Sequence, residues 1–301
     1  MSMRILLLGC KGQVGWELQR SLAPLGELLA CDFDTPGDLK ADFSDPEALA
    51  ALVRRVQPQI IVNSAAHTAV DKAESEPDFA RTLNATAPGV LAREAAALGA
   101  LLVHYSTDYV FDGSGSERRG EDAPTGPLSV YGRTKLEGEQ LIRASGCRHL
   151  ILRTSWVYAA RGGNFARTML KLAAERDSLK VISDQVGAPT GAELLADVTA
   201  HAVRRVLAEP ALAGLYHCVA GGETNWFEYA RFVIEWARAH GQPVRVAPDA
   251  IHSIPTSDYP TPAARPLNSR LATHRLQQAF GLTLPHWQVG VERMLTEVLG
   301  R

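Results

Sequence analysis

The feature that most constrains the fold of this chain is a glycine-rich loop placed directly after a short apolar run. The run Arg4–Leu8 is followed by Gly9, Gly12 and Gly15, and an amphipathic stretch continues over Gln13–Leu25. This order predicts a strand, a tight turn and a helix. Glycines at the turn let backbone amides approach a pyrophosphate, and the helix N-terminus supplies partial positive charge. The loop therefore predicts a dinucleotide-binding unit, while a glycine-rich turn without a ligand is the alternative.

Strand-like and helix-like stretches alternate through the first half of the chain. Strands are expected at Leu28–Cys31, Ile60–Asn63, Leu101–Ser106 and Leu150–Arg153, and helices from a capping box at Ser44–Glu47 to Val56, at Asp78–Leu98 and at Leu128–Ser145. Repeated strand–helix units with short connections predict a parallel sheet covered on both faces, the Rossmann-type doubly wound α/β fold.

The second half is less regular and carries more helix than strand. Helices are expected at Phe165–Arg176, Glu193–Ala208, Asn225–His240 and Trp287–Leu299, and short strands at Val181–Ile182 and Leu215–Cys218. We predict a dinucleotide-binding Rossmann domain over residues 1–160 and a smaller, mostly helical C-terminal part over 161–301 that binds substrate. Strands and helices within residues 161–301 can also belong to the first domain in space.

The composition excludes some classes of binding partner and indicates the cellular compartment. The chain has 301 residues and a net charge of −2, so no basic excess points to nucleic acid or to an anionic membrane. The four cysteines show no C-x-x-C spacing, which favours free thiols over a disulfide framework or a zinc site. No stretch approaches the roughly 20 apolar residues of a membrane span. We expect a cytoplasmic protein.

Tyr131 and Lys135 carry the strongest chemical signal. They stand four residues apart in SVYGRTKLEGE, so a helix brings both to one face. An ammonium beside a phenol favours the phenolate and lowers the tyrosine pKa, which predicts a proton donor and acceptor that works near neutral pH. Together with a nucleotide-binding loop, this pair indicates hydride transfer to or from a carbonyl substrate.

Further candidates lie where other strands end. Asp32 follows the second strand, where a carboxylate would bond the adenosine ribose and disfavour a 2′-phosphate, whereas Lys11 would attract that phosphate. The choice between NADH and NADPH is therefore open. Asp42 and Phe43 are expected either at the edge of an adenine pocket or in a simple turn that leads into the next helix. Three more residues lie at strand ends that should face the ligand: Ala65, Ala66 and Thr107.

These residues together resemble the extended short-chain dehydrogenase/reductase family. The matching segments are VNSAAHTAVDKAESEP, HYSTDYVFDG, VYGRTKLEGE, RTSWVYA, DQVGAPTGAELLAD and YPTPAARPLNSRL, which span nearly the whole chain. The resemblance implies an NAD(P)H-dependent reductase that acts on the C4 ketone of a nucleotide-linked deoxysugar.

The resemblance also implies a role for each candidate residue. Tyr131 would donate a proton to the sugar oxygen, Lys135 would bond the nicotinamide ribose, and Thr107 would complete the catalytic set. Thr107, Asp108 and Trp156 would contact the sugar. The cofactor would be lined by Gly9, Gly12, Gln13, Val14, Gly15, Asp32, Asp42, Phe43, Ala65, Ala66, His67, Tyr131 and Lys135.

Some relatives form homodimers that hold Mg²⁺ through interface glutamates, and Glu17, Glu193 and Glu297 lie in matching stretches. Each of these glutamates is explained equally well as a solvent-exposed residue of a helix, so no metal ligand is assigned. The competing functions are another nucleotide-sugar reductase, an epimerase, or a non-catalytic nicotinamide-binding regulatory subunit. A 4,6-dehydratase would need a glutamate where this chain has Tyr109.

Overall fold

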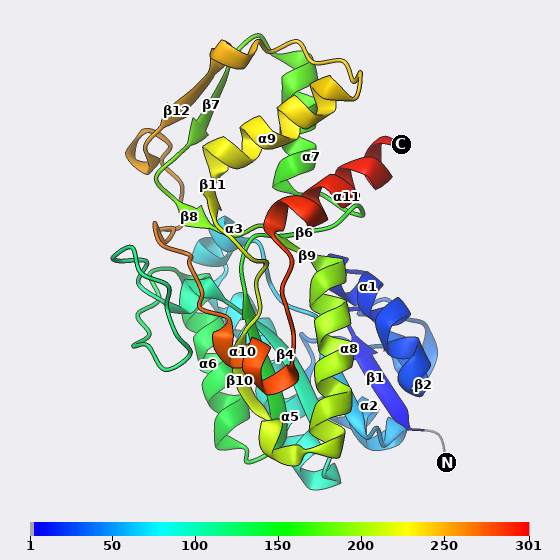
Figure 1. The fold of residues 1–301 in the computed structure, drawn as a ribbon. Helices are drawn as coiled ribbons and strands as arrows, with labels where there is room; N and C mark the ends of the chain where they lie inside the picture. Colours follow the sequence, from blue (N-terminus) through cyan, green and yellow to red (C-terminus); the bar gives the residue numbers. More distant parts are fainter. Residues whose placement is uncertain (1–2, 301) are drawn as a thin grey trace.

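The computed structural model describes residues 3–300 and is built around one six-stranded parallel sheet (Figure 1). The strand order is β10-β5-β4-β3-β1-β2, and every neighbouring pair is parallel. Its strands are β1 (Arg4–Leu8), β2 (Glu27–Cys31), β3 (Ile60–Asn63), β4 (Leu101–Thr107), β5 (Arg148–Thr154) and β10 (Gly214–His217). The order reverses beside β1, so the sheet has the switch point at which doubly wound folds bind ligands.

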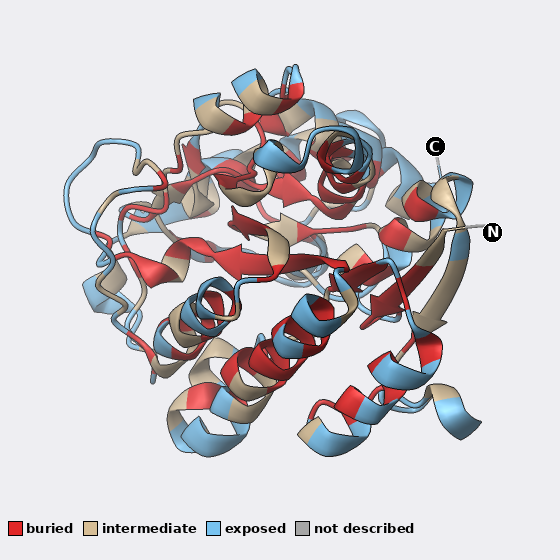
Figure 2. Ribbon diagram, turned by 90° about the horizontal axis from the view of Figure 1, so that it is seen from below, coloured by how far each residue is buried: buried red, intermediate tan, exposed pale blue. Residues whose placement is uncertain are grey.

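Helices cover both faces of this sheet. They are α1 (Gln13–Leu22), α2 (Pro46–Val56), α3 (Val70–Ser75), α4 (Pro77–Arg81), α5 (Ala87–Leu98), α6 (Val130–Ala144), α8 (Ala192–Ala208) and α10 (His274–Phe280). Alternate residues of β1 enter different cores: Ile5 packs in the cluster that contains α8, and Leu6 packs in the cluster that contains α2 and α5. Buried residues accordingly run through the middle of the sheet and the inner faces of the helices (Figure 2). The predicted Rossmann-type fold is confirmed.

The smaller part lies beyond one end of the sheet (Figure 1). Its helices are α7 (Phe165–Glu175), α9 (Trp226–Ala239) and α11 (Trp287–Leu299). Three two-stranded sheets accompany them: β7 (Leu179–Ile182) with β12 (Ile251–Ile254), β8 (Val186–Gly187) with β11 (Thr224–Asn225), and β6 (Val157–Tyr158) with β9 (Thr190–Gly191). Tyr229, Trp287 and Val291 lie in its separate apolar core. Short 3₁₀ turns occur at Ala23–Leu25, Gly37–Leu39, Asp108–Val110, Pro210–Leu212, Pro248–Ala250 and Thr256–Asp258.

The chain crosses between the two parts more than once. β10 and α8 come from the second half of the sequence, yet β10 pairs with β5 and α8 packs against α1. The two parts are thus not two consecutive pieces of sequence, and the boundary near residue 160 stays a prediction. Within residues 3–300, no helix combines the length and apolarity that crossing a bilayer requires.

Two local predictions are wrong. The cap of α2 is Asp45, whose carboxylate accepts the Ala48 N–H at 3.0 Å, whereas Ser44 donates to Asp42. The predicted single helix over Asp78–Leu98 is interrupted by a π-turn at Thr82–Thr86. A Cβ at Gly138 of α6 would lie 2.2 Å from the Asn84 carbonyl oxygen, so α6 packs directly on this widened turn.

Candidate active site

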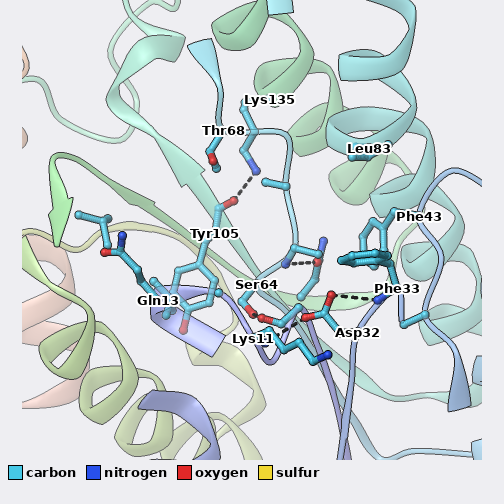
Figure 3. Close-up of a pocket in the computed structure, with 18 of the residues that line it drawn as sticks. Lys11, Gln13, Asp32, Phe33, Phe43, Ser64, Thr68, Leu83, Tyr105 and Lys135 are labelled. Atoms are coloured by element: carbon cyan, nitrogen blue, oxygen red, sulfur yellow. Dashed lines mark hydrogen bonds between the residues drawn. The ribbon is translucent and has the colours of Figure 1, made fainter. Parts of the chain in front are cut away.

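A cavity of about 940 Å³ lies at the carboxyl ends of the central strands (Figure 3). The loop after β1, the loop after β3, the end of β4 and the first turns of α6 all face it. Most predicted cofactor residues line it: Gly9, Gly12, Gln13, Val14, Asp32, Asp42, Phe43, Ala65, Ala66, Tyr131 and Lys135. The predicted residues outside its lining are Gly15, His67, Thr107, Asp108 and Trp156. The cavity thus joins the glycine loop to the tyrosine–lysine pair.

The glycine loop is compact because side chains are excluded from it. Gly9 has φ +79°, and a Cβ there would lie 2.6 Å from the Ala65 backbone nitrogen. A Cβ at Gly15 would lie 2.0 Å from the Gly9 carbonyl oxygen, so Gly15 packs the helix on the loop instead of facing the cavity. Gly12 is the N-cap of α1 and offers no capping side chain. The first turn of α1 therefore suits a phosphate better than a side chain.

Asp32 and Lys11 meet at one end of this cavity. Both carboxylate oxygens of Asp32 accept backbone N–H groups, from Lys11 at 2.9 Å and from Phe33 at 2.9 Å. The Lys11 ammonium turns instead to Asp34, at 2.6 Å. The carboxylate is thus held in place at the expected ribose end, and Lys11 is already paired with an acid. This end of the cavity therefore carries the Asp32 carboxylate and a lysine whose charge is balanced by Asp34.

Asp42 and Phe43 lie beside the same end. Ser44, followed by Lys40, holds the pKa of Asp42 below its usual range. Phe43 is buried while Phe33 is exposed, and Figure 3 shows both rings on the side of the cavity that holds Asp32. Two apolar rings beside the Asp32 carboxylate offer a flat surface on which an aromatic ligand could stack.

The small residues after β3 leave space for a ligand. Ala65 and Ala66 line the cavity, whereas His67 is buried behind them. The His67 N–H donates to the Asn84 side chain at 2.8 Å, and its ring packs edge-on against Phe79. His67 therefore supports the wall through Phe79, and it does not line the cavity itself.

Capping and close packing hold Tyr131 and Lys135 in place. Ser129 caps α6 by accepting the Gly132 N–H at 3.1 Å, and the Glu74 carboxylate accepts the Val130 N–H at 2.7 Å. The side chain of Lys135 is buried, with its nitrogen 2.6 Å from the Tyr105 carbonyl oxygen. Figure 3 shows this bond reaching from α6 to the end of β4.

The expected effect of Lys135 on Tyr131 is wrong in this structure. Burial raises the pKa of Tyr131 to about 12, and the opposing contribution comes from the Thr107 hydroxyl, not from the ammonium. Burial also lowers the pKa of Lys135 to about 8. The sequence showed that the two residues share a helix face, but it could not show how deeply that face is covered. At neutral pH Tyr131 is a protonated phenol.

A second group of predicted residues lies next to the cavity. The Thr107 hydroxyl donates to Asp108 at 3.0 Å, and burial raises the pKa of Asp108 to about 6. Trp156 has φ +50°, which is rare for a bulky residue and typical of functional sites, and its ring stacks on Trp226 at 3.7 Å. A Cβ at Gly187 would touch both the Trp156 ring and Ser269, whose hydroxyl opposes the rise in the Asp108 pKa. Trp156 and Asp108 therefore belong to one polar and aromatic cluster.

Sequence reasoning missed several residues of the cavity wall, which are Phe33, Thr68, Phe79, Leu83, Tyr105, Thr154, Val157 and Gly162. Thr154 ends β5, so the rule that located Thr107 at the end of β4 would have found it. The others come from loops, helices and two strands, with Tyr105 in β4 and Val157 in β6, and only the tertiary fold brings them to this edge.

The three glutamates named as metal candidates do not form a metal site within one chain. Burial raises the pKa of Glu193, with smaller contributions of the same sign from Glu17 and Glu297 and an opposing one from Arg293. Across residues 3–300, no group of three His, Cys, Asp or Glu side chains is placed to hold a metal ion. The suggested Mg²⁺ therefore has no support in this structure.

The chain matches the family model described as "RmlD substrate binding domain" over residues 3–299. It is 58% identical over 296 residues to the dTDP-4-dehydrorhamnose reductase of Escherichia coli K12, with 98% of each chain covered. A solved dTDP-4-dehydrorhamnose reductase from Clostridium acetobutylicum has a TM-score of 0.88 at 35% identity, with 99% of this chain and 100% of that chain covered.

The same enzyme from Bacillus anthracis, solved in complex with NADP, has a TM-score of 0.87 at 32% identity and covers 99% of this chain and 100% of its own. The predicted resemblance to a family of nicotinamide-dependent oxidoreductases is confirmed. The chain belongs to the RmlD substrate binding domain family, the dTDP-4-dehydrorhamnose reductases of the extended short-chain dehydrogenase/reductases.

Proposed function

We propose that this chain catalyses the NAD(P)H-dependent reduction of the C4 ketone of dTDP-4-dehydro-L-rhamnose to dTDP-L-rhamnose. The observation that carries the proposal is that Tyr131 and Lys135 line the same cavity as the glycine loop. A cofactor held by that loop would extend toward the pair. The sequence relatives support the choice of substrate.

The protonation state of Tyr131 fits the direction of reduction. Reduction of a ketone to an alcohol adds a hydride to carbon and a proton to oxygen. Because burial keeps the Tyr131 pKa far above neutrality, the phenol holds the proton that the sugar oxygen needs. The Thr107 hydroxyl, when it turns from Asp108 to Tyr131, lowers the cost of the phenolate that remains. Lys135 bonds the cofactor ribose in this proposal.

The cofactor supplies the hydride when it is bound. Gly9 and Gly12 receive the pyrophosphate, and Asp32 lies at the adenosine ribose. The remaining cofactor contacts come from Gln13, Val14, Asp42, Phe43, Ala65 and Ala66. NADH and NADPH are both proposed, because the carboxylates of Asp32 and Asp34 oppose a 2′-phosphate while a relative was solved with NADP. Thr107, Asp108 and Trp156 are proposed to contact the deoxysugar.

The proposal places the reaction last in dTDP-rhamnose synthesis for cell-surface polysaccharide. We also propose that the chain acts in the cytoplasm as a homodimer, which rests on the family resemblance. No residue is assigned to nucleic acid or to a membrane.

The test is turnover of the purified protein with dTDP-4-dehydrorhamnose, followed by the loss of reduced-nicotinamide absorbance, with a sugar-free control. Sugar-dependent oxidation that yields dTDP-L-rhamnose by NMR supports the proposal, and parallel NADH and NADPH assays rank the cofactors. Intact cofactor binding without oxidation would overturn it and favour another nucleotide sugar or a regulatory subunit.

A further inference from the structure

The polar and aromatic cluster around Trp156 ends at a buried glutamine, Gln185. This residue directly precedes β8, and Trp226 directly follows β11. The antiparallel register of the two strands pairs Val186 with Asn225, so the same register continued by one residue places Gln185 opposite Trp226. The indole N–H of Trp226 donates to Oε1 of Gln185 at 3.0 Å. Because Gln185 is only 4% exposed, water does not compete for this bond.

The Gln185 amide has only one orientation that suits its neighbours. An indole N–H can only donate, so Gln185 must present its oxygen to Trp226. Its NH₂ group then donates to Oγ1 of Thr256 at 3.1 Å. The Thr256 hydroxyl gives its own proton to Asp184 at 2.6 Å, and the Asp184 carboxylate also accepts the Thr256 N–H at 2.9 Å. Each donor in this row faces an acceptor, so the row fixes the edge of the Trp226 ring.

The Trp226 ring in turn supports the ring of Trp156. The two rings stack with their centroids 3.7 Å apart and their planes at 16°. Trp156 has a left-handed backbone, with φ +50°, which a bulky residue keeps only where its surroundings over-determine it. Its carbonyl accepts the Thr190 N–H at 3.2 Å, which holds the backbone but not the side-chain torsions. Gly187, beside the same ring, has no side chain to hold it. The stack on Trp226 therefore opposes rotation of the Trp156 ring.

We propose that Gln185 and Trp226 are positioning residues for sugar binding. Gln185 fixes the indole plane of Trp226, and Trp226 holds the Trp156 ring in the orientation that meets the deoxysugar. The inference rests on the proposed function, in which Trp156 contacts the sugar. Neither Gln185 nor Trp226 is among the residues that line the cavity of the glycine loop. Their effect therefore falls on the affinity for sugar and not on the affinity for cofactor.

A second stack on the same helix shows what stacking alone requires. Trp236, near the end of α9, stacks on His240 with centroids 3.7 Å apart and planes at 18°. Neither residue of that pair has a positive φ. The pair of Trp156 and Trp226 differs in its strained backbone, and both of its rings are only partly buried. Trp236 is thus an internal reference for any measurement on the first stack.

The first test is NMR of the indole groups and needs neither cofactor nor sugar. The chain has five tryptophans, so ¹⁵N labelling gives five indole signals, and those of Trp156 and Trp226 are assigned by their loss in Trp156→Phe and Trp226→Phe. Gln185→Met keeps the length of the side chain but has no strong acceptor. In this variant we expect the Trp226 indole proton to exchange faster with solvent. We also expect the Trp156 signal to shift, because the Trp226 ring current changes when that ring moves, while the Trp236 signal stays in place.

Two results would overturn the proposal. A Trp226 proton that stays protected in Gln185→Met would show that the amide does not fix the ring. An unmoved Trp156 signal beside an unprotected Trp226 proton would show that the stack does not transmit the change. Should Gln185→Met not fold, Thr256→Val removes the acceptor of the Gln185 amide and is judged by the same two signals.

The matched control is Gln277→Met on α10. It removes a hydrogen bond of the same kind, from Nε2 of Gln277 to Oγ1 of Thr273 at 3.0 Å. All five indole signals should keep their positions in this variant. A shift of the Trp156 signal here as large as in Gln185→Met would mean that the signal reports general loosening, and the proposal would be rejected.

The second test separates sugar binding from the other kinetic parameters. In Gln185→Met we expect the KM for dTDP-4-dehydrorhamnose to rise about three- to tenfold, while kcat and the KM for reduced nicotinamide change by less than about twofold. Trp226→Leu, which removes the stack, should raise the sugar KM further. Equal losses for sugar and cofactor, or a lower kcat at an unchanged sugar KM, would reject the positioning role. Absence of turnover in the unchanged protein would reject the proposed reaction instead, and the NMR signals would still decide whether Gln185 and Trp226 hold Trp156.

Discussion

Gly132 of α6 lies against Tyr109, in the turn after β4, with no room for a side chain between them. A Cβ at Gly132 would lie 2.3 Å from the Tyr109 carbonyl oxygen. The turn that begins with Thr107 and the helix that carries Tyr131 are therefore in direct backbone contact. The distance between the hydroxyls of Thr107 and Tyr131, which are both proposed to be catalytic, depends on that contact.

We expect Gly132→Ala to lower turnover far more than the addition of a single methyl group would suggest. The methyl group must push α6 away from a backbone oxygen, which cannot rotate aside. Overpacking of this kind costs about 1–3 kcal/mol of stability, and a shift of about 1 Å at reacting groups costs about 10²-fold in rate. Steady-state kcat and urea unfolding measure both. Gly120→Ala, where a Cβ meets no atom within 4 Å, is the control. Equal activity of the two variants would contradict the argument.

Tyr131→Phe removes the proposed proton donor and keeps the ring that packs edge-on against Tyr109. We expect kcat to fall by about 10²–10⁴-fold while nicotinamide affinity and the unfolding midpoint stay unchanged. Tyr229→Phe, in the smaller part, is the matched control, because it deletes a buried phenol hydroxyl that has no hydrogen-bond partner in the described part of the chain. Near-normal kcat in Tyr131→Phe would remove Tyr131 from the proposed role.

The parts of the site that could be predicted from sequence are those fixed by neighbours in sequence. The glycine loop and the Tyr131/Lys135 spacing are local patterns, so both appear where the sequence placed them. The pKa of Tyr131 could not be predicted, because it depends on burial by segments far away in the chain. The link between Gln185 and Trp226 was missed for a related reason, since it exists only through the register of two strands.

Local rules also failed where two neighbouring residues competed. Ser44 and Asp45 are both good caps, and the sequence favoured Ser44 because of the capping-box spacing. In the structure Ser44 is bonded to Asp42, which leaves Asp45 to cap α2. The π-turn before α5 had no sequence signal at all, because it accommodates the close approach of Gly138 on another helix.

Asp34→Asn tests how the chain treats a 2′-phosphate. The Asp34 carboxylate pairs with the Lys11 ammonium, which holds the pKa of Asp34 below its usual range. Without it, the Lys11 ammonium is free to meet the phosphate of NADPH, so we expect the ratio of kcat/KM for NADPH to that for NADH to rise about two- to fivefold. The effect should shrink in high salt, because the pair is exposed. Asp38→Asn changes another exposed carboxylate of the same loop and is the control. An unchanged ratio would mean that Lys11 does not reach the phosphate.

Asp108 makes stability depend on pH in the direction opposite to most carboxyl groups. Burial raises its pKa from 3.8 to about 6, and its Oδ2 atom has no hydrogen-bond partner among residues 3–300. The folded protein therefore holds this proton at pH values where the unfolded chain has lost it. Stability from this group falls as pH rises from about 4 to about 6, by an amount on the order of 3 kcal/mol.

Asp108→Asn removes that dependence, because an amide carries no charge to bury. Relative to the unchanged protein, we expect the variant to gain free energy of unfolding near pH 7 and to gain little or none near pH 4, as measured by urea unfolding at both pH values. Asp112→Asn is the control of opposite sign: its pKa is lowered, first by the Ser114 backbone N–H, so its loss should cost stability near pH 7. If the Asp108→Asn difference were the same at both pH values, Asp108 would not be titrating in this range. A pH-dependent gain together with reduced turnover would mean that the charge near Thr107 is kept for the reaction at the expense of stability.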